Sequence, residues 1–251
     1  MISRAILYSP AALCALLFAL AAPLRAQSNT PGFRYAETNF FAARREFLAA
    51  PTNVAVATRL ATASFDRAEF ATNDTERAML AMAAINPLRE LLARHPKTAA
   101  AHYYLAMNLG QLARTKTLGA LKLVDEMEIE FKAALALDPH LDHAGPDRNL
   151  GQLYFQAPGW PASVGSHSKA RKHLERAAEL APDFPENRLS LAEAYLKWRE
   201  KKLLAQELAG LEKIWLPAKT NLTGIDWENA WLDWQQRRQK LKQDSAKILK
   251  P

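Results

Sequence analysis

Histidines and their carboxylate neighbours are the side chains of this sequence whose spacing best fits a catalytic or metal site. His140 and His143 lie beside Asp138 and Asp142, in a predicted turn after Pro139. Two imidazoles and two carboxylates form a donor set that Zn²⁺ accepts. One hypothesis is therefore a metal-dependent enzyme at this turn. A solvated turn that follows a proline accounts for the same residues without a metal, and we favour that interpretation.

Other catalytic patterns are weak or missing from the sequence. There is no glycine-rich phosphate loop and no serine-hydrolase elbow. The one cysteine, Cys14, lies in an apolar N-terminal run. Glu126, Glu128 and Glu130 alternate with apolar residues and cannot all share one helix face. We therefore expect a non-catalytic protein with no metal ligands and no cofactor.

The composition indicates which elements must position any functional group. Of the 251 residues, 49% are hydrophobic and 24% charged, a proportion typical of globular proteins. There are only four valines and seven isoleucines, too few β-branched residues for a large sheet. Alanine, leucine, glutamate, lysine and arginine, which favour helices, are abundant. The sequence predicts an all-α protein.

The N-terminus has the pattern of a secretory signal peptide. Arg4 precedes an apolar run of twelve residues, Ala11 to Ala22, which is too short to span a bilayer. Ala26 is a suitable last residue before cleavage, so we expect a signal peptide over residues 1–26 and export, most simply to the periplasm. Loss of this segment lowers the net charge from +7 to +5. That charge is too small to indicate nucleic-acid binding.

A repeated pattern in the middle of the chain predicts the arrangement of the helices. Leu-Ala or Leu-Gly pairs recur at intervals of 45, 45 and 41 residues, starting at Leu60, Leu105, Leu150 and Leu191. A second helical stretch follows each pair. Proline disfavours helical geometry in the residue before it, so these stretches should stop at Pro96, Pro139, Pro182 and Pro217. The pattern predicts four helical hairpins over residues 54–217, preceded by a linker and an N-terminal helix over 27–53.

The third unit carries the clearest motif. Its residues follow the order Leu150, Gly151, Tyr154, Ala170, Leu174, Ala177 and Pro182. This order resembles the tetratricopeptide repeat (TPR) family, whose unit is about 34 residues long. The resemblance implies antiparallel helix pairs, with the extra residues of the first three units placed between their two helices. The expected fold is a TPR-like helical-hairpin solenoid of about four units.

A narrower resemblance covers residues 145–191. With the Ala157-Pro158-Gly159 segment, Gly165 and the Lys169-Ala170 pair, this stretch looks like the T component of tripartite ATP-independent periplasmic (TRAP) transporters. That resemblance implies an accessory role in solute transport and a periplasmic solute-binding protein as partner. Members of that group carry a lipid-anchored cysteine after the signal peptide, and Cys14 does not fit that position.

The first helices of TPR-like units face the concave side, and this places a predicted binding surface. The expected binding residues are Tyr103, Met107, Arg148, Gln152 and Glu193. Arg148 is the expected anchor, because its guanidinium can hold a carboxylate with two parallel hydrogen bonds. Trp160, between Gly159 and Pro161, either covers its own repeat or serves as a lid or docking point at the groove. The surface should bind a protein partner or a small molecule.

The C-terminal segment, residues 218–251, predicts an amphipathic helix that caps the solenoid. Asp226 is the expected N-cap, and Trp227, Trp234, Leu241 and Ile248 recur every seven residues. The opposite face is expected to carry the basic residues Arg237, Arg238, Lys240, Lys242 and Lys247. A solenoid end needs a helix with a polar outer face. The alternatives are a helix that binds an anionic membrane surface and one that makes an oligomer contact.

Overall fold

Ten α-helices lie within residues 30–116 and 118–249, the part of the chain that the computed structural model describes. They are α2 (Pro31–Ala49), α3 (Val54–Glu69), α4 (Asp74–Arg94), α5 (Ala99–Ala113), α6 (Ala120–Leu137), α7 (Leu141–Gln156), α8 (His167–Leu180), α9 (Pro185–Trp198), α10 (Lys201–Asn221) and α11 (Ile225–Leu249). Within these ranges one isolated bridge, between Gly159 and Gly165, is the only β-type pairing. The predicted all-α fold class is confirmed. The expected signal peptide, residues 1–26, lies outside the described residues.

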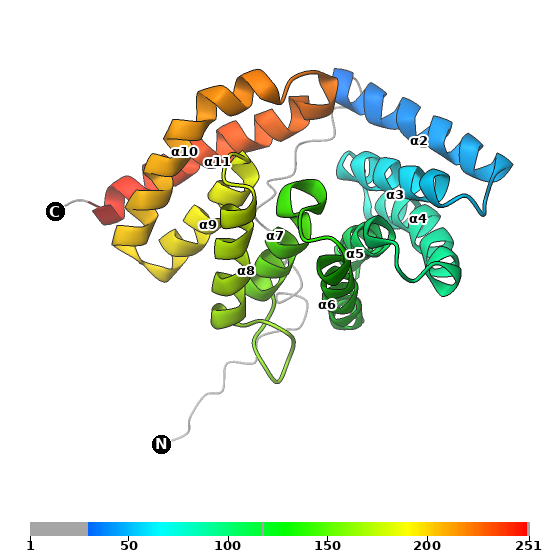
Figure 1. Ribbon diagram of the computed structural model, residues 1–251, viewed down its shortest axis with the longest axis horizontal. Helices are drawn as coiled ribbons and strands as arrows, with labels where there is room; N and C mark the ends of the chain where they lie inside the picture. The colour runs from blue at the N-terminus through cyan, green and yellow to red at the C-terminus, as the bar shows by residue number, and fades with distance from the viewer. Residues whose placement is uncertain (1–29, 117, 250–251) are drawn as a thin grey trace.

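Helices α3 to α10 form four successive hairpins, as the repeat pattern predicts. The pairs are α3 with α4, α5 with α6, α7 with α8, and α9 with α10. The Leu60, Leu105, Leu150 and Leu191 pairs lie on the first helices, and all four leucines are buried. The hairpins follow one another along an arc (Figure 1). The repeat spacing therefore predicted the order and pairing of these helices correctly.

A close approach between the two helices of the third hairpin explains the glycine of its motif. A Cβ atom added to Gly151 on α7 would lie 2.6 Å from Cγ and 3.0 Å from the backbone nitrogen of Leu174 on α8. Only a residue without a side chain allows the two helices to approach this closely. The small residues of the motif thus set the spacing between the helices of this pair.

Two details of the repeat prediction are wrong. Pro217 lies inside α10, which continues to Asn221. Its missing N–H costs one helical hydrogen bond. However, Trp215 and Ala218 on either side are buried in the C-terminal core cluster, which is formed by residues of α8 to α11, and this packing keeps the stretch helical. The extra length of the first unit lies in its long helices, because residues 70–73 alone connect α3 to α4.

Side-chain caps start several helices. The Thr30 hydroxyl accepts a hydrogen bond from the Phe33 backbone, and Pro31 occupies the first helical turn. The linker expected after residue 26 therefore gives way to helix by Pro31, because a Ser or Thr cap followed by proline is a strong helix start. Helix α11 begins at Ile225, two residues earlier than an N-cap at Asp226 would place it.

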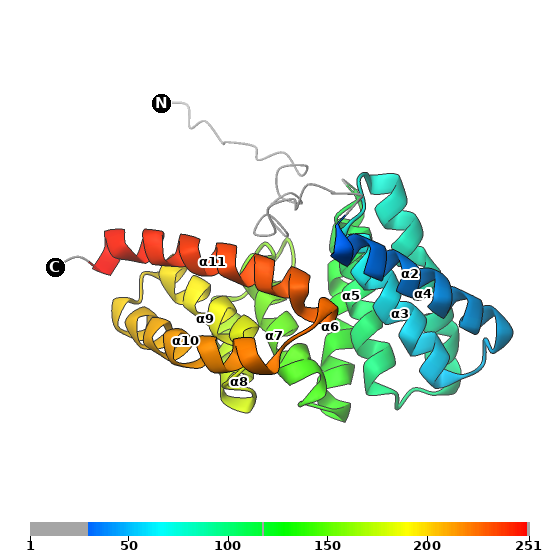
Figure 2. The ribbon, with the colours of Figure 1, turned by 90° about the horizontal axis from the view of Figure 1, so that it is seen from above.

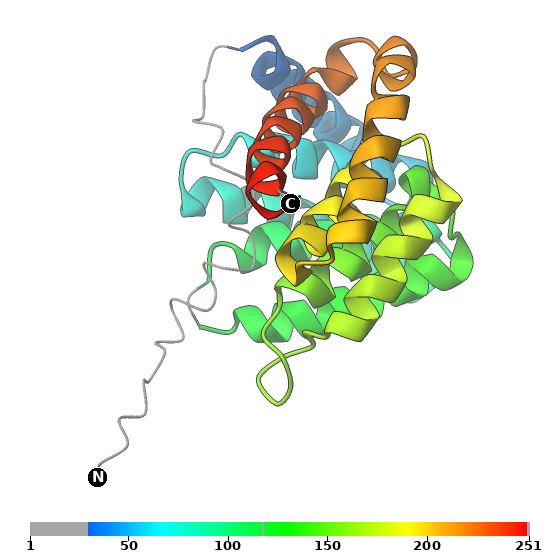
Figure 3. The same cartoon turned by 90° about the vertical axis from the view of Figure 1, so that its left-hand side faces the viewer.

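Helix α11 does more than cover the end of the solenoid. It packs along α9 and, less extensively, α10, and it also contacts α2 at the other end of the arc (Figures 1 and 2). Seen from the end of the last hairpin, α9 lies beside both α10 and α11 (Figure 3). A Cβ atom on Gly32 of α2 would lie 2.7 Å from the Asn229 side chain of α11. The C-terminal helix thus closes the open side of the arc.

Candidate binding cavity

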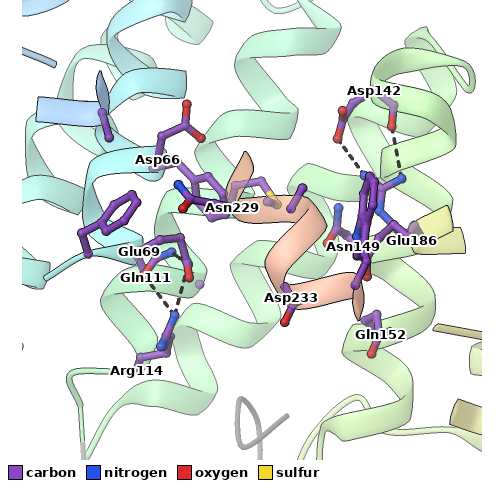
Figure 4. Close-up of a pocket in the computed structure, with 18 of the residues that line it drawn as sticks. Asp66, Glu69, Gln111, Arg114, Asp142, Asn149, Gln152, Glu186, Asn229 and Asp233 are labelled. Carbon is purple, nitrogen blue, oxygen red and sulfur yellow. Dashed lines mark hydrogen bonds and ion pairs between the residues drawn. The ribbon is translucent and has the colours of Figure 1, made fainter. Parts of the chain in front are cut away.

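The first helices of the hairpins and the two terminal helices line most of a cavity of about 850 Å³, with further residues from α4, α6 and the connection between α3 and α4. Helices α3, α5, α7 and α9 line it on one side, and α2 and α11 line it on the other. Figure 4 shows the polar side chains that point into it from these helices. Ligand sites in proteins commonly measure about 300–1,000 Å³, so the cavity has the size of a site for a small molecule or a short peptide segment.

The structure brings five of the six predicted binding residues together. Tyr103, Met107, Arg148, Gln152 and Glu193 all line the cavity. They come from three successive first helices, α5, α7 and α9. Equivalent positions of stacked units therefore do face one common concave space, which is the geometric premise of the prediction.

Trp160, the sixth residue, lies elsewhere. It is 89% exposed, in the connection between α7 and α8, and it does not line the cavity. The expectation that it covers its own repeat is therefore wrong, because a covering tryptophan would be buried. Because the segment that carries Trp160 connects α7 to α8, its side chain lies outside the helix faces that build the core.

Arg148 is not the free anchor that we expected. Its guanidinium donates to Oδ2 of Asp142 at 2.7 Å, to Oδ1 of Asn187 at 3.0 Å, and to the backbone carbonyls of Asp142 and His143, both at 3.2 Å. The residue is only 7% exposed. Because these internal partners engage both terminal nitrogens, Arg148 cannot also hold a ligand carboxylate with the same two nitrogens.

The partners of Arg148 stabilise a left-handed turn at the start of α7. Asp142, His143 and Ala144 have φ values of 47°, 55° and 63°. Each left-handed residue other than glycine costs about 1–2 kcal/mol, and such a conformation persists only where its surroundings hold it. Arg148 and Asn187 supply that support by donating hydrogen bonds to the carbonyls of the turn. The turn directs Asp142 towards the cavity, where it accepts a short hydrogen bond from Tyr103.

Glu193 is also engaged within the protein. Arg237 of α11 contacts the carboxylates of Glu186, Glu193 and Asp233 at 2.6, 2.9 and 3.1 Å. Burial opposes ionisation of Glu186, but Arg237 and Arg148 outweigh it and lower the pKa of this carboxyl group. This network ties α11 to α9 along the cavity wall.

Sequence reasoning placed Arg237 on the outer basic face, and this was wrong. The spacing of the two residues could have corrected this prediction. Arg237 lies three residues after Trp234 and therefore shares the helix face of that tryptophan. Trp234 is buried and donates a hydrogen bond from Nε1 to Glu186. The packing of one tryptophan therefore turns its arginine neighbour inwards.

The opposite end of the cavity, between α3 and α5, is also polar. The Gln111 side chain donates to Glu69, Arg114 pairs with Glu69 at 3.2 Å, and Arg77 donates to Gln111 at 2.8 Å. Asp66, one helical turn before Glu69, lines the same end of the cavity (Figure 4). Within residues 30–116 and 118–249, no hydrogen bond or ion pair of Asp66 occurs. The sequence analysis missed Asp66, because nothing in its spacing marks a cavity residue.

The charge of the cavity lining is predominantly negative. The charged lining residues are Asp66, Glu69, Asp142, Glu186, Glu193, Asp226, Asp233, Arg77, Arg114, Arg148 and Arg237. The Asp66 side chain is exposed to the cavity. Partial desolvation by the surrounding walls, together with the negative charges of Glu69, Asp142 and Asp226, raises the pKa of its carboxyl group to about 7. The cavity is therefore acidic, although the chain as a whole is basic.

Side chains of the turn at His140 and His143 make contacts within the protein. Asp142 is bound to Tyr103 and Arg148, and the His143 ring stacks on Phe184 with centroids 4.2 Å apart. Across the part of the chain that the structure describes, no three potential ligands of the His, Cys, Asp and Glu types gather as a metal site. The alternative of a metal-dependent enzyme at this turn therefore loses the arrangement on which it rested.

The tryptophans of α11 face the protein interior. Trp231 and Trp234 are buried against the C-terminal core cluster, and Trp227 packs partly against the same cluster. The apolar face that a membrane-surface helix would insert is therefore already covered. In the described ranges, no helix is both long enough and apolar enough to cross a bilayer.

Comparison with known proteins supports the repeat architecture. No family model and no curated protein sequence matches the chain. Among solved structures, it is similar to the crystal structure of TTC0263, a thermophilic TPR protein of Thermus thermophilus, with a TM-score of 0.58 and 19% identity. The match covers 93% of this chain and 97% of that one. The fold is thus TPR-like, an architecture whose stacked repeats form concave interaction surfaces.

Proposed function

We propose that this chain is an exported, non-catalytic scaffold that binds a segment of a protein partner or a small solute in its cavity. The observation that carries the proposal is the cavity itself, which four hairpins build and α11 closes. Its size and its mixture of aromatic, amide and charged side chains suit ligand recognition better than a flat contact surface would. The TPR-like fold adds support, because the concave side is where such repeats bind partners.

Filling the cavity should abolish binding. Gln152 is half-buried, lines the cavity and bonds only to Gln156 of the same helix among the contacts described. Gln152→Trp should therefore fill the space without breaking a network between helices. In pull-downs from the native cell envelope, we expect at least tenfold less of the main protein or solute than with wild type. Mass spectrometry of both fractions measures this loss.

The matched control is Lys172→Trp, which adds the same ring to the exposed face of α8. It should recover the same molecules as wild type. Equal recovery with Gln152→Trp, with the fold verified by circular dichroism, would exclude the cavity as the binding site.

Export is proposed from the sequence alone. The apolar run and its flanking residues support cleavage near Ala26. The intact mass of the exported protein should then correspond to a loss of about 26 residues without a lipid. A full-length or lipid-modified mass would contradict the proposal.

A transport role is the most specific form of the hypothesis, and it rests on the resemblance to the TRAP T component. In that case the partner would be a periplasmic solute-binding protein, and the same pull-down tests for it.

A further inference from the structure

Asp66 is a cavity carboxylate that pairs with none of the arginines lining the cavity in the described residues. Arg148 and Arg237 are paired at one end, and Arg114 is paired with Glu69 at the other. Arg77 donates to Gln111 and to the backbone carbonyl of Ala68. Asp66 lies among Glu69, Asp142 and Asp226, all of which raise its pKa. A carboxylate without a cation therefore faces the cavity from α3.

These acidic groups come from helices far apart in the sequence. Asp66 is on α3, Asp142 is in the left-handed turn of α7, and Asp226 is in the first turn of α11. Asp226 raises the pKa of the Tyr35 hydroxyl on α2, and both residues line the cavity. Only the closed arc brings them together, and at neutral pH their mutual repulsion favours any bound positive charge.

The walls around these carboxylates are largely aromatic and apolar. Tyr35, Phe65, Met107 and Trp227 line the same cavity. Aromatic faces attract organic cations, and apolar walls accommodate the hydrocarbon stem that carries such a group. A bare metal ion fits poorly, because within residues 30–116 and 118–249 the carboxylates do not converge as a metal site. The lining suits a charged organic group.

We propose that the cavity binds a ligand bearing a primary ammonium group on an apolar stem, with Asp66 as the carboxylate that receives the ammonium. The proposal rests on the proposed function and specifies the ligand of the same site. The ammonium group can belong to a small amine or to a lysine side chain of a protein partner, and both present the same chemistry to Asp66.

Calorimetric titration with matched probes tests the charge requirement. The cationic probes are 1,5-diaminopentane and a short acetylated, amidated peptide that contains lysine. The neutral and anionic probes are the same peptide with norleucine and with glutamate in place of lysine. At pH 8 we expect binding of the cationic probes and at least tenfold weaker binding of the other two. Tighter binding of the diamine would identify a small amine as the ligand type, and tighter binding of the lysine peptide a protein segment.

Asp66→Asn tests the assigned residue, with Asp125→Asn on the exposed side of α6 as the matched control. Asp66→Asn should weaken binding of the better cationic probe at least tenfold, and Asp125→Asn should leave it unchanged. Equal binding of the lysine and norleucine peptides, unchanged binding by Asp66→Asn, or no binding of any probe would each overturn the proposal. If wild type recovered a partner that Gln152→Trp does not recover, the proposed function would stand even though the ammonium proposal had failed.

The pH profile gives a second readout. Because the pKa of Asp66 is raised to about 7, the affinity of wild type for the diamine should increase between pH 6 and pH 8, and that of Asp66→Asn should not. The other ionisable groups that face Asp66 are Glu69 on α3, Asp142 on α7, Asp226 on α11, Tyr35 on α2 and Tyr104 on α5. Asp66→Asn retains all of these groups and His143. If its affinity for the diamine showed the same pH dependence as that of wild type, the dependence would come from those groups, and the role of Asp66 would be contradicted.

The stability of the free protein provides a check on folding. An acid whose pKa is raised in the folded state destabilises that state as the pH rises from its unfolded value, near 4, to its folded value. Asp66→Asn should therefore melt at a higher temperature than wild type at pH 8 and lose this advantage at pH 4. A lower melting temperature at pH 8 would show that Asp66 has a structural partner and would contradict the proposal.

Discussion

Ala177→Glu should strongly destabilise the protein. Ala177 is fully buried on α8, and its backbone carbonyl accepts a hydrogen bond from Asn187 of α9. A glutamate at this position would bury a charge without a partner and force two closely packed elements apart. We expect a loss of about 4 kcal/mol or more in the free energy of unfolding. For a domain of this size, that corresponds to a fall in melting temperature of about 10 °C.

Thermal and urea denaturation followed by circular dichroism measure this effect. Lys172→Glu, on the exposed face of the same helix, should change the stability by no more than about 0.5 kcal/mol. If the two variants melted together, α8 would not pack with the face that carries Ala177 inwards.

Removal of the Arg148 guanidinium should have the second-largest effect. Arg148→Met retains most of the apolar stem but leaves the Asp142 carboxylate, the Asn187 amide oxygen and two carbonyls of the left-handed turn without this donor. Removing one partner of a fully buried ion pair costs about 3–5 kcal/mol; here Arg148 is buried and the Asp142 side chain is 35% exposed. We expect a loss in that range, because the strained turn loses its main support as well.

The matched control is Arg89→Met, which removes an arginine from a well-formed but exposed ion pair with Glu126. Such pairs contribute less than about 1 kcal/mol, and urea denaturation of both variants gives the comparison. Equal losses for the two variants would mean that the left-handed turn does not depend on Arg148. Because Arg148 holds the fold together, its substitution would also be a poor test of ligand binding, and Gln152 and Asp66 serve that purpose better.

Local sequence patterns were sufficient for the helices and their pairing. The repeated Leu-Ala and Leu-Gly pairs correctly marked the first helix of each hairpin. Helix periodicity depends on residues close together in the chain, and small residues such as Gly151 contact the next helix. Pro96, Pro139 and Pro182 follow α4, α6 and α8 for the same local reason. Pro217 shows the limit of this reasoning, because packing of Trp215 and Ala218 kept α10 helical through a proline.

The sequence by itself determined an all-α, TPR-like chain of four hairpins, and it correctly placed Tyr103, Met107, Arg148, Gln152 and Glu193 on one concave side. Only the tertiary structure decided which of these side chains are already paired within the protein and which remain available to a ligand. Pairing depends on contacts between residues about 40 to 50 positions apart, such as Arg148 with Asn187 and Glu193 with Arg237. It also decided the closure of the arc by α11, and with it the acidic surroundings of Asp66. Electrostatic interactions act through space and leave no periodic trace in the sequence, whereas helix packing does.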